Sequence, residues 1–230
     1  MTKFFTVHDE SKNTKGRIGK LKFFGIEVET PVFMPVGTIG MIRTLTKDDM
    51  HEIGYNLILN NAYHLFLRPG LDVLNDAGGI AKLTQWDGGI ITDSGGFQID
   101  SLSDFRKITD EGVRFRNHID GAYHNFTPKN VIDIQRTIKS HIIMPLDECT
   151  KSDTDKNYAQ KAMDRTHEWA KISKNYNDTF EDRQVLFGIV QGNMYEDLRK
   201  VSAETLVDMD FDGYSIGGLS VGEEKHLMYN

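Results

Sequence analysis

The segment "GIITDSGGFQ", residues 89–98, places an apolar run directly before an aspartate and two glycines. An apolar run without polar alternation is typical of a strand that is buried on both faces of a parallel sheet. Similar runs recur along the chain: "FMPVGT" at 33–38, "NLILNN" at 56–61, "HIIMPLDE" at 141–148, "VLFGIVQG" at 185–192 and "GYSIGG" at 213–218. The sequence therefore predicts six strands of one buried sheet.

The segments between these runs carry helix signals. Thr46 precedes "KDDMHEI" and has Asp49 three residues later, which is the pattern of a capping box. Thr127 is followed by a proline, which suits the first position of a helix. Residues 153–176 and 195–209 have the apolar spacing of amphipathic helices. Strands that alternate with helices in this way predict an α/β fold.

Two α/β architectures fit this pattern, a (β/α)8 TIM-type barrel and an open doubly wound sheet. The barrel is favoured because no G-x-G-x-x-G motif follows the first run and because residues 1–34 predict an N-terminal antiparallel β cap. Six strand–helix units are two short of a closed barrel, so we expect residues 1–230 to form a single, incomplete barrel domain. Residues 106–126 alternate as β-structure does and contain two turn signals, which predicts a hairpin insertion.

Composition narrows the class of protein. With 39% hydrophobic residues, the 230-residue chain can bury one sizeable core. No apolar run approaches the roughly 20 residues that cross a bilayer, and the N-terminus is too charged for a signal peptide. We therefore expect a cytoplasmic protein without membrane contact. The single cysteine, Cys149, excludes an internal disulfide, and no metal site is expected because the eight histidines lack metal-binding spacing.

A net charge of −7 disfavours broad, nonspecific binding of nucleic acid. Four basic residues nevertheless gather around one predicted turn: Arg106, Lys107, Arg114 and Arg116. They form either a local phosphate-binding patch or the solvated face of a hairpin, and the sequence alone favours the solvated face.

Polar or glycine residues follow each apolar run, and in both architectures the carboxyl ends of the strands meet at one site. These residues are Gly37, Asn61, Asp93, Asp147, Gln191 and the pair Gly217 and Gly218. Each could instead cap a helix or close a turn. Two carboxylates could act as general acid and base, hold a divalent cation, or accept the N–H edge of a purine, which a glutamine amide would complete.

Seven motifs in fixed order carry a resemblance: "MPVGT", "NNAYHLFLRPG", "ITDSGGFQ", "RKITDEGVRFRNHIDG", "PLDECT", "FGIVQGNMYEDLR" and "DFDGYSIGGLSVGE". From about residue 30 to the C-terminus the chain resembles the bacterial tRNA-guanine transglycosylases, also called queuine tRNA-ribosyltransferases. The resemblance implies a modified (β/α)8 barrel with an N-terminal cap. It also implies a pentosyltransferase of queuosine biosynthesis, which replaces guanine at the tRNA wobble position with the 7-deazaguanine preQ1 by double displacement through a covalent ribosyl-enzyme.

The resemblance also implies roles for particular residues. Asp93 corresponds to the proton acceptor beside the anomeric carbon, in a loop with Ser94, Gly95, Gly96 and Phe97. Asp147 corresponds to the aspartate that binds the N–H edge of the base. The other implied base contacts are Gln191, Gly218, Leu219 and Val221, where valine rather than glycine favours preQ1 over queuine. Supporting positions are Asn61, His64, Cys149 and Glu223.

The chain departs from the family pattern in several places. It has no Asp-Cys-Val-x-Pro-Thr-Arg motif, so we expect no nucleophile in this chain, and it lacks the Cys-x-Cys-x-x-Cys cluster that holds Zn²⁺ in full-length members. The zinc subdomain is therefore expected to be absent. Smaller departures are Ala62, Asp100, His141 and Asn193.

These departures leave two functions open. The first is a base-exchange transferase acting on the tRNA anticodon loop, guanine and preQ1, as a homodimer in the complete family. The second is a truncated, noncatalytic relative that binds the base or a partner transglycosylase subunit. An incomplete barrel has unpaired strand edges, so we expect the chain to be unstable alone unless a second polypeptide completes it.

Overall fold

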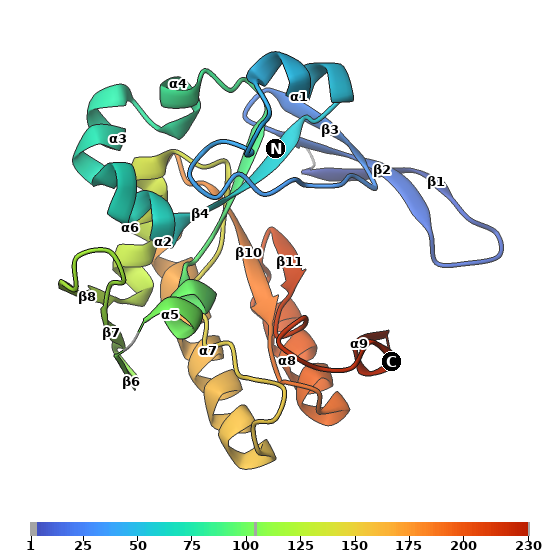
Figure 1. Cartoon of the computed structure of the whole chain (residues 1–230). Coiled ribbons are helices and arrows are strands. Elements are labelled where there is room, and N and C mark those ends of the chain that lie inside the picture. The colour runs from blue at the N-terminus through green and yellow to red at the C-terminus, as the bar shows by residue number, and fades with distance from the viewer. Residues whose placement is uncertain (1–3, 104, 230) are drawn as a thin grey trace. The chain divides into compact units, whose positions relative to one another are not determined.

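The computed structural model describes residues 4–103 and 105–229, which form two compact units (Figure 1). Unit 1 comprises Met1–Thr92 and Thr137–Ile142, and unit 2 comprises Asp93–Arg136 and Ile143–Asn230. Each unit contains parallel strands and helices, so the chain has an α/β fold with parallel sheet, as predicted. The described strands do not close into a barrel. No described helix has the length and apolarity needed to cross a membrane.

Unit 1 begins with an antiparallel sheet within the segment for which we predicted a cap. Its strands are β1 (Phe5–Glu10), β2 (Arg17–Phe23) and β3 (Ile26–Thr30), in that order. Val28 lies opposite Leu21 and is buried, as is Phe23 at the end of β2. A side chain at Gly19 would collide with the ring of Phe5, so that ring packs directly on the β2 backbone.

The helices of unit 1 are short. They are α1 (Lys47–Ile53), α2 (Ala62–Leu65), the π-helix η1 (Phe66–Gly70), α3 (Leu71–Ala77) and α4 (Ile80–Thr84). The predicted capping box of α1 is confirmed: the Asp49 N–H donates to Thr46 Oγ1 at 3.1 Å, and the Thr46 N–H donates to the Asp49 carboxylate at 2.7 Å. The helix ends at Gly54, whose φ of 89° suits a residue without Cβ.

The parallel strands of unit 1 are β4 (Leu57–Asn61) and β5 (Gly89–Asp93), and Ile91 of β5 pairs with Ile142. The apolar residues of β4 and β5 are buried, apart from Leu59, which is only partly buried. The prediction of a buried strand at residues 33–38 is wrong, because Val36 makes only a single bridge to Leu59 and Phe33 is exposed. Prolines at 31 and 35 lack the N–H groups that a central strand needs.

Unit 2 contains β10 (Val185–Val190) and β11 (Gly213–Ile216), which pair in parallel, and β9 (Ile142–Ile143) lies where the two units divide. The predicted long helices are confirmed as α7 (Lys156–Asn177) and α8 (Glu196–Asp208). Residues from these elements and from α6 (Pro128–Ile138) form one core cluster with Phe211: Ile132, Ile143, Ala170, Leu186 and Leu206.

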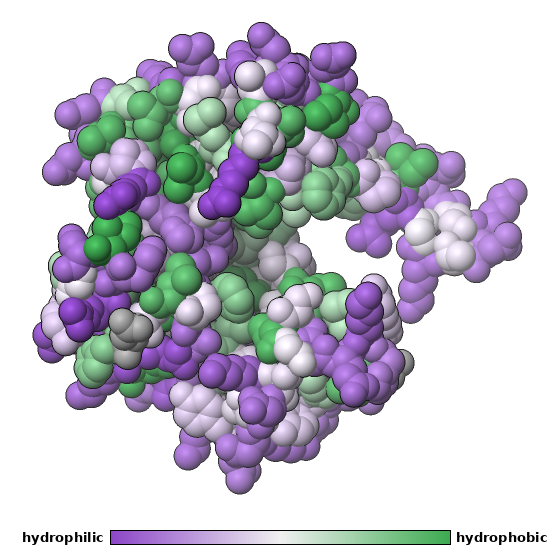
Figure 2. All heavy atoms as spheres, viewed as in Figure 1, coloured by the Kyte–Doolittle hydropathy of each residue, from purple (hydrophilic) through white to green (hydrophobic). Residues whose placement is uncertain are grey.

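The strand β11 is not buried on both faces, contrary to the prediction. Ile216 is 75% exposed, and Tyr214 is exposed as well. β11 is the last strand in the order of its sheet, so only its β10 edge is paired. Apolar side chains reach the surface at several places in the molecule (Figure 2).

The predicted hairpin insertion is a three-stranded antiparallel sheet, one strand more than expected. Its strands are β6 (Arg106–Thr109), β7 (Gly112–Arg116) and β8 (Tyr123–Phe126). The remaining helices of unit 2 are α5 (Gly96–Leu102) and α9 (Lys225–Tyr229). Val113, Phe115 and Phe126 are buried, so one face of this sheet belongs to the core of unit 2.

The capping box gives a direct test of the fold of unit 1. Replacing Thr46 with alanine removes one side of the box, and we expect it to lower the free energy of unfolding by about 1 kcal/mol. Thr46→Ser keeps the hydroxyl and is the matched control. Urea unfolding followed by circular dichroism measures both variants; equal midpoints for Thr46→Ala and wild type would contradict the assignment.

Candidate functional site

The structure brings together three of the predicted site residues in unit 2. Asp147 follows β9, Gln191 follows β10 directly, and Ser94 follows β5. The Ser94 hydroxyl donates to Asp147 Oδ1 at 2.8 Å, and the Gln191 amide donates to Asp147 Oδ2 at 2.8 Å. Both oxygens of one carboxylate are therefore held by side chains from two other segments of the chain.

The environment of Asp147 favours its neutral form. Part of the residue reaches the surface, but its carboxyl group is enclosed by protein, and this burial raises its pKa above the ordinary value of 3.8. Hydrogen bonds from Ser94 and Gln191 oppose the increase, while the charge of Glu148 adds to it. A carboxyl group with a raised pKa at the end of a strand is a candidate for binding or proton transfer.

Three glycines lie in close contact with Asp147 and Gln191. A Cβ on Gly96 would lie 2.5 Å from the Asp147 carbonyl oxygen. A Cβ on Gly217 would lie 2.9 Å from Gln191 Nε2, and a Cβ on Gly218 would lie 2.7 Å from Gln191 Oε1. Gly218 also has a φ of 68°, which disfavours other residues.

Asp93 ends β5, and its carboxylate accepts a hydrogen bond of 3.1 Å from Gln98 Nε2. The sequence did not single out Gln98, although it lies in the same motif five residues after Asp93. Phe97, between them in α5, is 48% exposed. An aromatic ring is thus presented to solvent beside the loop that contains Gly95 and Ser94.

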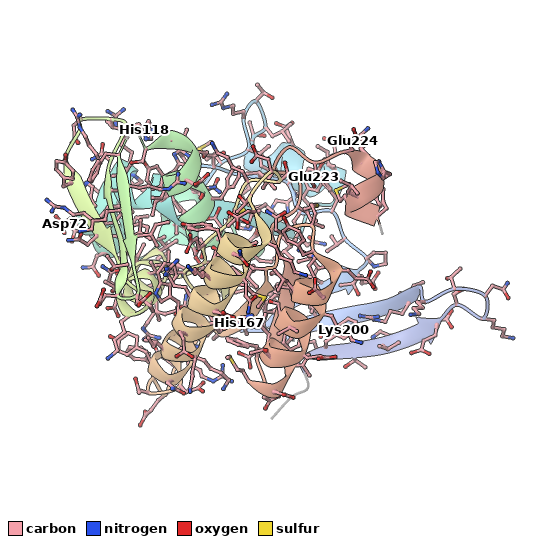
Figure 3. All side chains as sticks on the ribbon, turned by 90° about the horizontal axis from the view of Figure 1, so that it is seen from below. Asp72, His118, His167, Lys200, Glu223 and Glu224 are labelled. Atoms are coloured by element: carbon pink, nitrogen blue, oxygen red, sulfur yellow. The ribbon has the colours of Figure 1, made fainter. Side chains whose placement is uncertain are left out.

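The loop after β11 is organised by Glu223. Its carboxylate accepts the backbone N–H groups of Ser220 at 2.5 Å and Val221 at 2.8 Å, and the Ser220 bond in particular lowers the Glu223 pKa. Figure 3 labels Glu223 and Glu224 in the segment that leads into α9. Leu219 lies in this loop between Gly218 and Ser220.

Asn193 replaces a glycine of the family pattern, and the structure shows how it is tolerated. Its φ of 55° is left-handed, a conformation that asparagine adopts more readily than most residues. Its amide donates to Thr150 Oγ1 at 3.0 Å and to the Lys151 carbonyl at 2.6 Å.

Arg199 of α8 donates to the Gly217 carbonyl at 3.1 Å. This hydrogen bond connects α8, which follows β10, to the loop that follows β11.

Two buried residues, Ser202 and His167, hold the backbone of Gln191 in place. Nothing in the sequence indicated this role. The Gln191 backbone N–H donates to Ser202 Oγ at 3.1 Å, and His167 Nε2 lies 2.9 Å from the same oxygen. His167, which is labelled in Figure 3, comes from α7. Ser202 comes from α8. A histidine and a serine on amphipathic helices give no local signal of this role, since the contact spans 35 positions.

Cys149, another predicted site residue, is poorly suited to act as a nucleophile or a metal ligand. Burial, followed by the charge of Asp147, raises the pKa of Cys149 to about 12, so its thiol stays protonated and is a poor nucleophile or metal ligand. Within residues 4–103 and 105–229 no group of three His, Cys, Asp or Glu side chains could hold a metal ion. The residues present therefore do not fit the zinc site of the family. Asn61 and His64 lie in unit 1, and Gly37 does too.

A small cavity of about 20 Å³ adjoins Asp147. Its lining includes Gly96 and Cys149 together with Arg106 and Ile108 of β6. This volume suffices for about one water molecule.

Comparison with known proteins adds independent evidence. The family model described as queuine tRNA-ribosyltransferase matches residues 11–230. The queuine tRNA-ribosyltransferase of Caldanaerobacter subterraneus subsp. tengcongensis is 52% identical over 98% of the chain, and that of Thermoanaerobacter pseudethanolicus is 51% identical over 99%. The one from Desulforamulus reducens is 50% identical over 97%. The chain spans about 60% of the length of each of these relatives.

The His167–Ser202 contact predicts a pH dependence of stability. Burial lowers the His167 pKa below its ordinary value of 6.5, although Asp164 and Glu168 oppose this. Because the folded-state pKa is depressed, the stabilisation is present above pH 6.5 and is lost as the pH falls through the folded-state value. We expect His167→Gln to reduce the loss of unfolding free energy between pH 7 and pH 5.

Urea unfolding at a series of pH values measures this dependence. His118→Gln, in the exposed turn after β7, is the control and should retain the wild-type dependence. An unchanged dependence in His167→Gln would show that His167 is not one of the groups responsible.

Proposed function

Because the chain belongs to the queuine tRNA-ribosyltransferase family, we propose that it binds guanine and the 7-deazaguanine preQ1 at Asp147 and supplies the base-binding part of a tRNA base-exchange enzyme. The relatives are named queuine tRNA-ribosyltransferases, and the chain spans about 60% of their length. The activity proposed for the chain is therefore that of a larger whole, to which unit 2 contributes the base site.

One observation carries the proposal: the enclosed Asp147 carboxylate accepts one hydrogen bond on each oxygen, from Ser94 and from Gln191. The Watson–Crick edge of guanine offers two adjacent N–H groups, which match a carboxylate in the same bidentate way. When these N–H groups replace Ser94 and Gln191, the Gln191 amide is free to donate to the guanine O6. Because Gly217 and Gly218 have no side chains, the base can approach the backbone of this segment closely. The backbone groups of Gly218 and Leu219 then contact the edge of the bound base.

Phe97 supplies the face on which the base stacks. Its side chain is 48% exposed, so part of the ring is open to a stacked base. Stacking of a base on an aromatic ring contributes about 1–3 kcal/mol. Val221, in the loop held by Glu223, narrows the site and favours preQ1 over a bulkier base.

The chemistry proceeds by double displacement. A carboxylate outside this chain attacks ribose C1′ and forms a ribosyl ester while guanine leaves with its bonding electrons and takes a proton at N9 from solvent water. The incoming preQ1 then attacks C1′ through N9 and releases the carboxylate. Asp93 accepts the N9 proton, and the bond from Gln98 orients its carboxylate for this step.

The larger architecture follows from the same family membership. The parallel strands of the two units belong to a modified (β/α)8 barrel, which the part of the relatives not spanned by this chain completes. Zn²⁺ and the homodimer interface belong to that larger whole, as does most of the contact with the tRNA anticodon loop.

The base site predicts a loss of affinity in Asp147→Asn. An amide has one acceptor oxygen and a donor NH₂ group in place of the second oxygen, so it cannot accept one N–H bond on each terminal atom. Hydrogen bonds to a charged group contribute about 1.5–3 kcal/mol each, so we expect guanine affinity to fall about 100-fold or more. Affinity in the wild type should also fall as the pH drops through the raised Asp147 pKa, because the protonated carboxyl loses one acceptor. Isothermal titration calorimetry measures both effects.

The Asp147→Asn substitution should lower guanine affinity but should not lower the stability of the chain. A folded-state pKa raised above the unfolded value means that burying the Asp147 charge costs stability as the pH rises. Asp147→Asn should therefore unfold at the same or a higher urea concentration than wild type at pH 7. Asp100→Asn, which lines the same cavity, is the matched control and should bind guanine almost normally. Equal guanine binding by Asp147→Asn and wild type would overturn the proposed function.

The role of Asp93 predicts a separate result in an exchange assay. Labelled guanine should enter tRNA only when the chain is mixed with the C-terminal part of a full-length relative, and Asp93→Asn should lower the rate by at least 100-fold. Incorporation by the chain alone would show that it contains its own nucleophile. Guanine binding without exchange in the mixture would identify a noncatalytic base-binding relative.

A further inference from the structure

The β6–β8 sheet of unit 2 has one face that the base site does not use. On β7, Val113 and Phe115 are buried, whereas Arg114 and Arg116 alternate with them and are exposed. Residues directly opposite one another on antiparallel strands share a face. Lys107 of β6 and Asn125 of β8 lie opposite Arg114.

The same face carries two exposed aromatic rings. Tyr123 lies opposite Arg116 and is 54% exposed, and Phe105 is 45% exposed. The two rings meet edge to face with centroids 5.7 Å apart, and the Arg114 guanidinium lies 4.9 Å from the Tyr123 ring centroid. We call the set Phe105, Lys107, Arg114, Arg116, Tyr123 and Asn125 the outer face.

The outer face is basic, with Lys107, Arg114 and Arg116 all exposed. Among the described residues no carboxylate forms an ion pair with Lys107, Arg114 or Arg116. Three acidic residues of the adjoining turns have other partners: Asp110 pairs with Arg165, Glu111 accepts from the Thr109 side chain, and Asp120 accepts from Asn117 and from the Ala122 N–H. Three positive charges therefore face solvent in a chain whose net charge is −7.

The sheet also reaches the base site from its other side. Arg106 and Ile108 of β6 and Val113 of β7 line the cavity beside Asp147. Figure 3 shows side chains extending from this sheet, with His118 labelled in the turn after β7. A polymer whose base occupies the Asp147 site would have its flanking nucleotides within reach of this sheet.

We propose that the outer face of the β6–β8 sheet binds a single-stranded segment of RNA next to the exchanged base. Its chemistry fits this occupant, because arginine and lysine contact phosphates while exposed Tyr and Phe rings stack on unpaired bases. A merely solvated basic face has no need of two exposed aromatic rings. The identity of the RNA as tRNA rests on the proposed function, but the surface and its chemistry do not.

The test measures binding of a fluorescein-labelled, mixed-sequence 12-nucleotide single-stranded RNA to the 230-residue chain by fluorescence anisotropy. Tyr123→Thr keeps a good strand residue and removes the ring, and we expect it to weaken binding about 10-fold. Arg114→Gln should reduce the slope of log affinity against log salt by about 0.7, the value for one phosphate contact on a single strand.

Lys200→Gln is the matched charge control, since Lys200 is exposed on α8 (Figure 3). It should bind RNA as wild type does, and circular dichroism checks that every variant is folded. The proposal is overturned if wild type does not bind, if the outer-face variants bind like wild type, or if Lys200→Gln weakens binding as much as Arg114→Gln. It is also overturned if duplex RNA or polyglutamate occupies the face as well as single-stranded RNA does.

Guanine titration of the same variants separates this proposal from the base site. Tyr123→Thr and Arg114→Gln should bind guanine normally, because neither residue lines the Asp147 cavity. Loss of guanine binding in Asp147→Asn with unchanged RNA binding in the outer-face variants would refute the RNA surface alone. The reverse result would refute the base site alone.

Discussion

The site in unit 2 depends on one constraint, the enclosure of the Asp147 carboxylate. A buried carboxyl group is costly unless both of its oxygens find donors, and Ser94 and Gln191 supply them. These two bonds join the loops that follow β5 and β10 to the segment after β9. The glycine at 96 follows from the same constraint, because a Cβ there would collide with Asp147, while Gly217 and Gly218 lie against the Gln191 side chain that donates to it.

Enclosure also gives the site its chemical character. A desolvated carboxylate binds paired N–H groups more strongly than an exposed one, since water no longer competes. The partners that satisfy it in the absence of a ligand are a hydroxyl and an amide, both of which can turn away. The cavity that adjoins Asp147 has a volume of about 20 Å³. Behind it, Ser202 accepts a hydrogen bond from the Gln191 backbone N–H, and His167 lies within hydrogen-bonding distance of the same hydroxyl.

The β6–β8 sheet is exposed on one face and buried on the other, and the two faces differ in chemistry. Its buried face packs Phe115 and Phe126 into the core of unit 2, while its outer face presents arginines and aromatic rings to solvent. Successive side chains of a strand point to opposite faces of the sheet, so even a short insertion can have one apolar face and one basic face. One element therefore lines the cavity beside Asp147 with one face and presents arginines and aromatic rings to solvent with the other.

The sequence by itself determined the α/β class, the capping box at Thr46 and the polar positions that end the strands. These depend on residues only a few positions apart, which local periodicity and capping rules capture. Tertiary structure alone decided which of those positions meet. Asp147 lies 53 residues from Ser94 and 44 from Gln191, and its contacts with both arise only from packing. The exposure of β11 was likewise undetermined by its apolar sequence, because burial depends on whether a neighbouring strand is present.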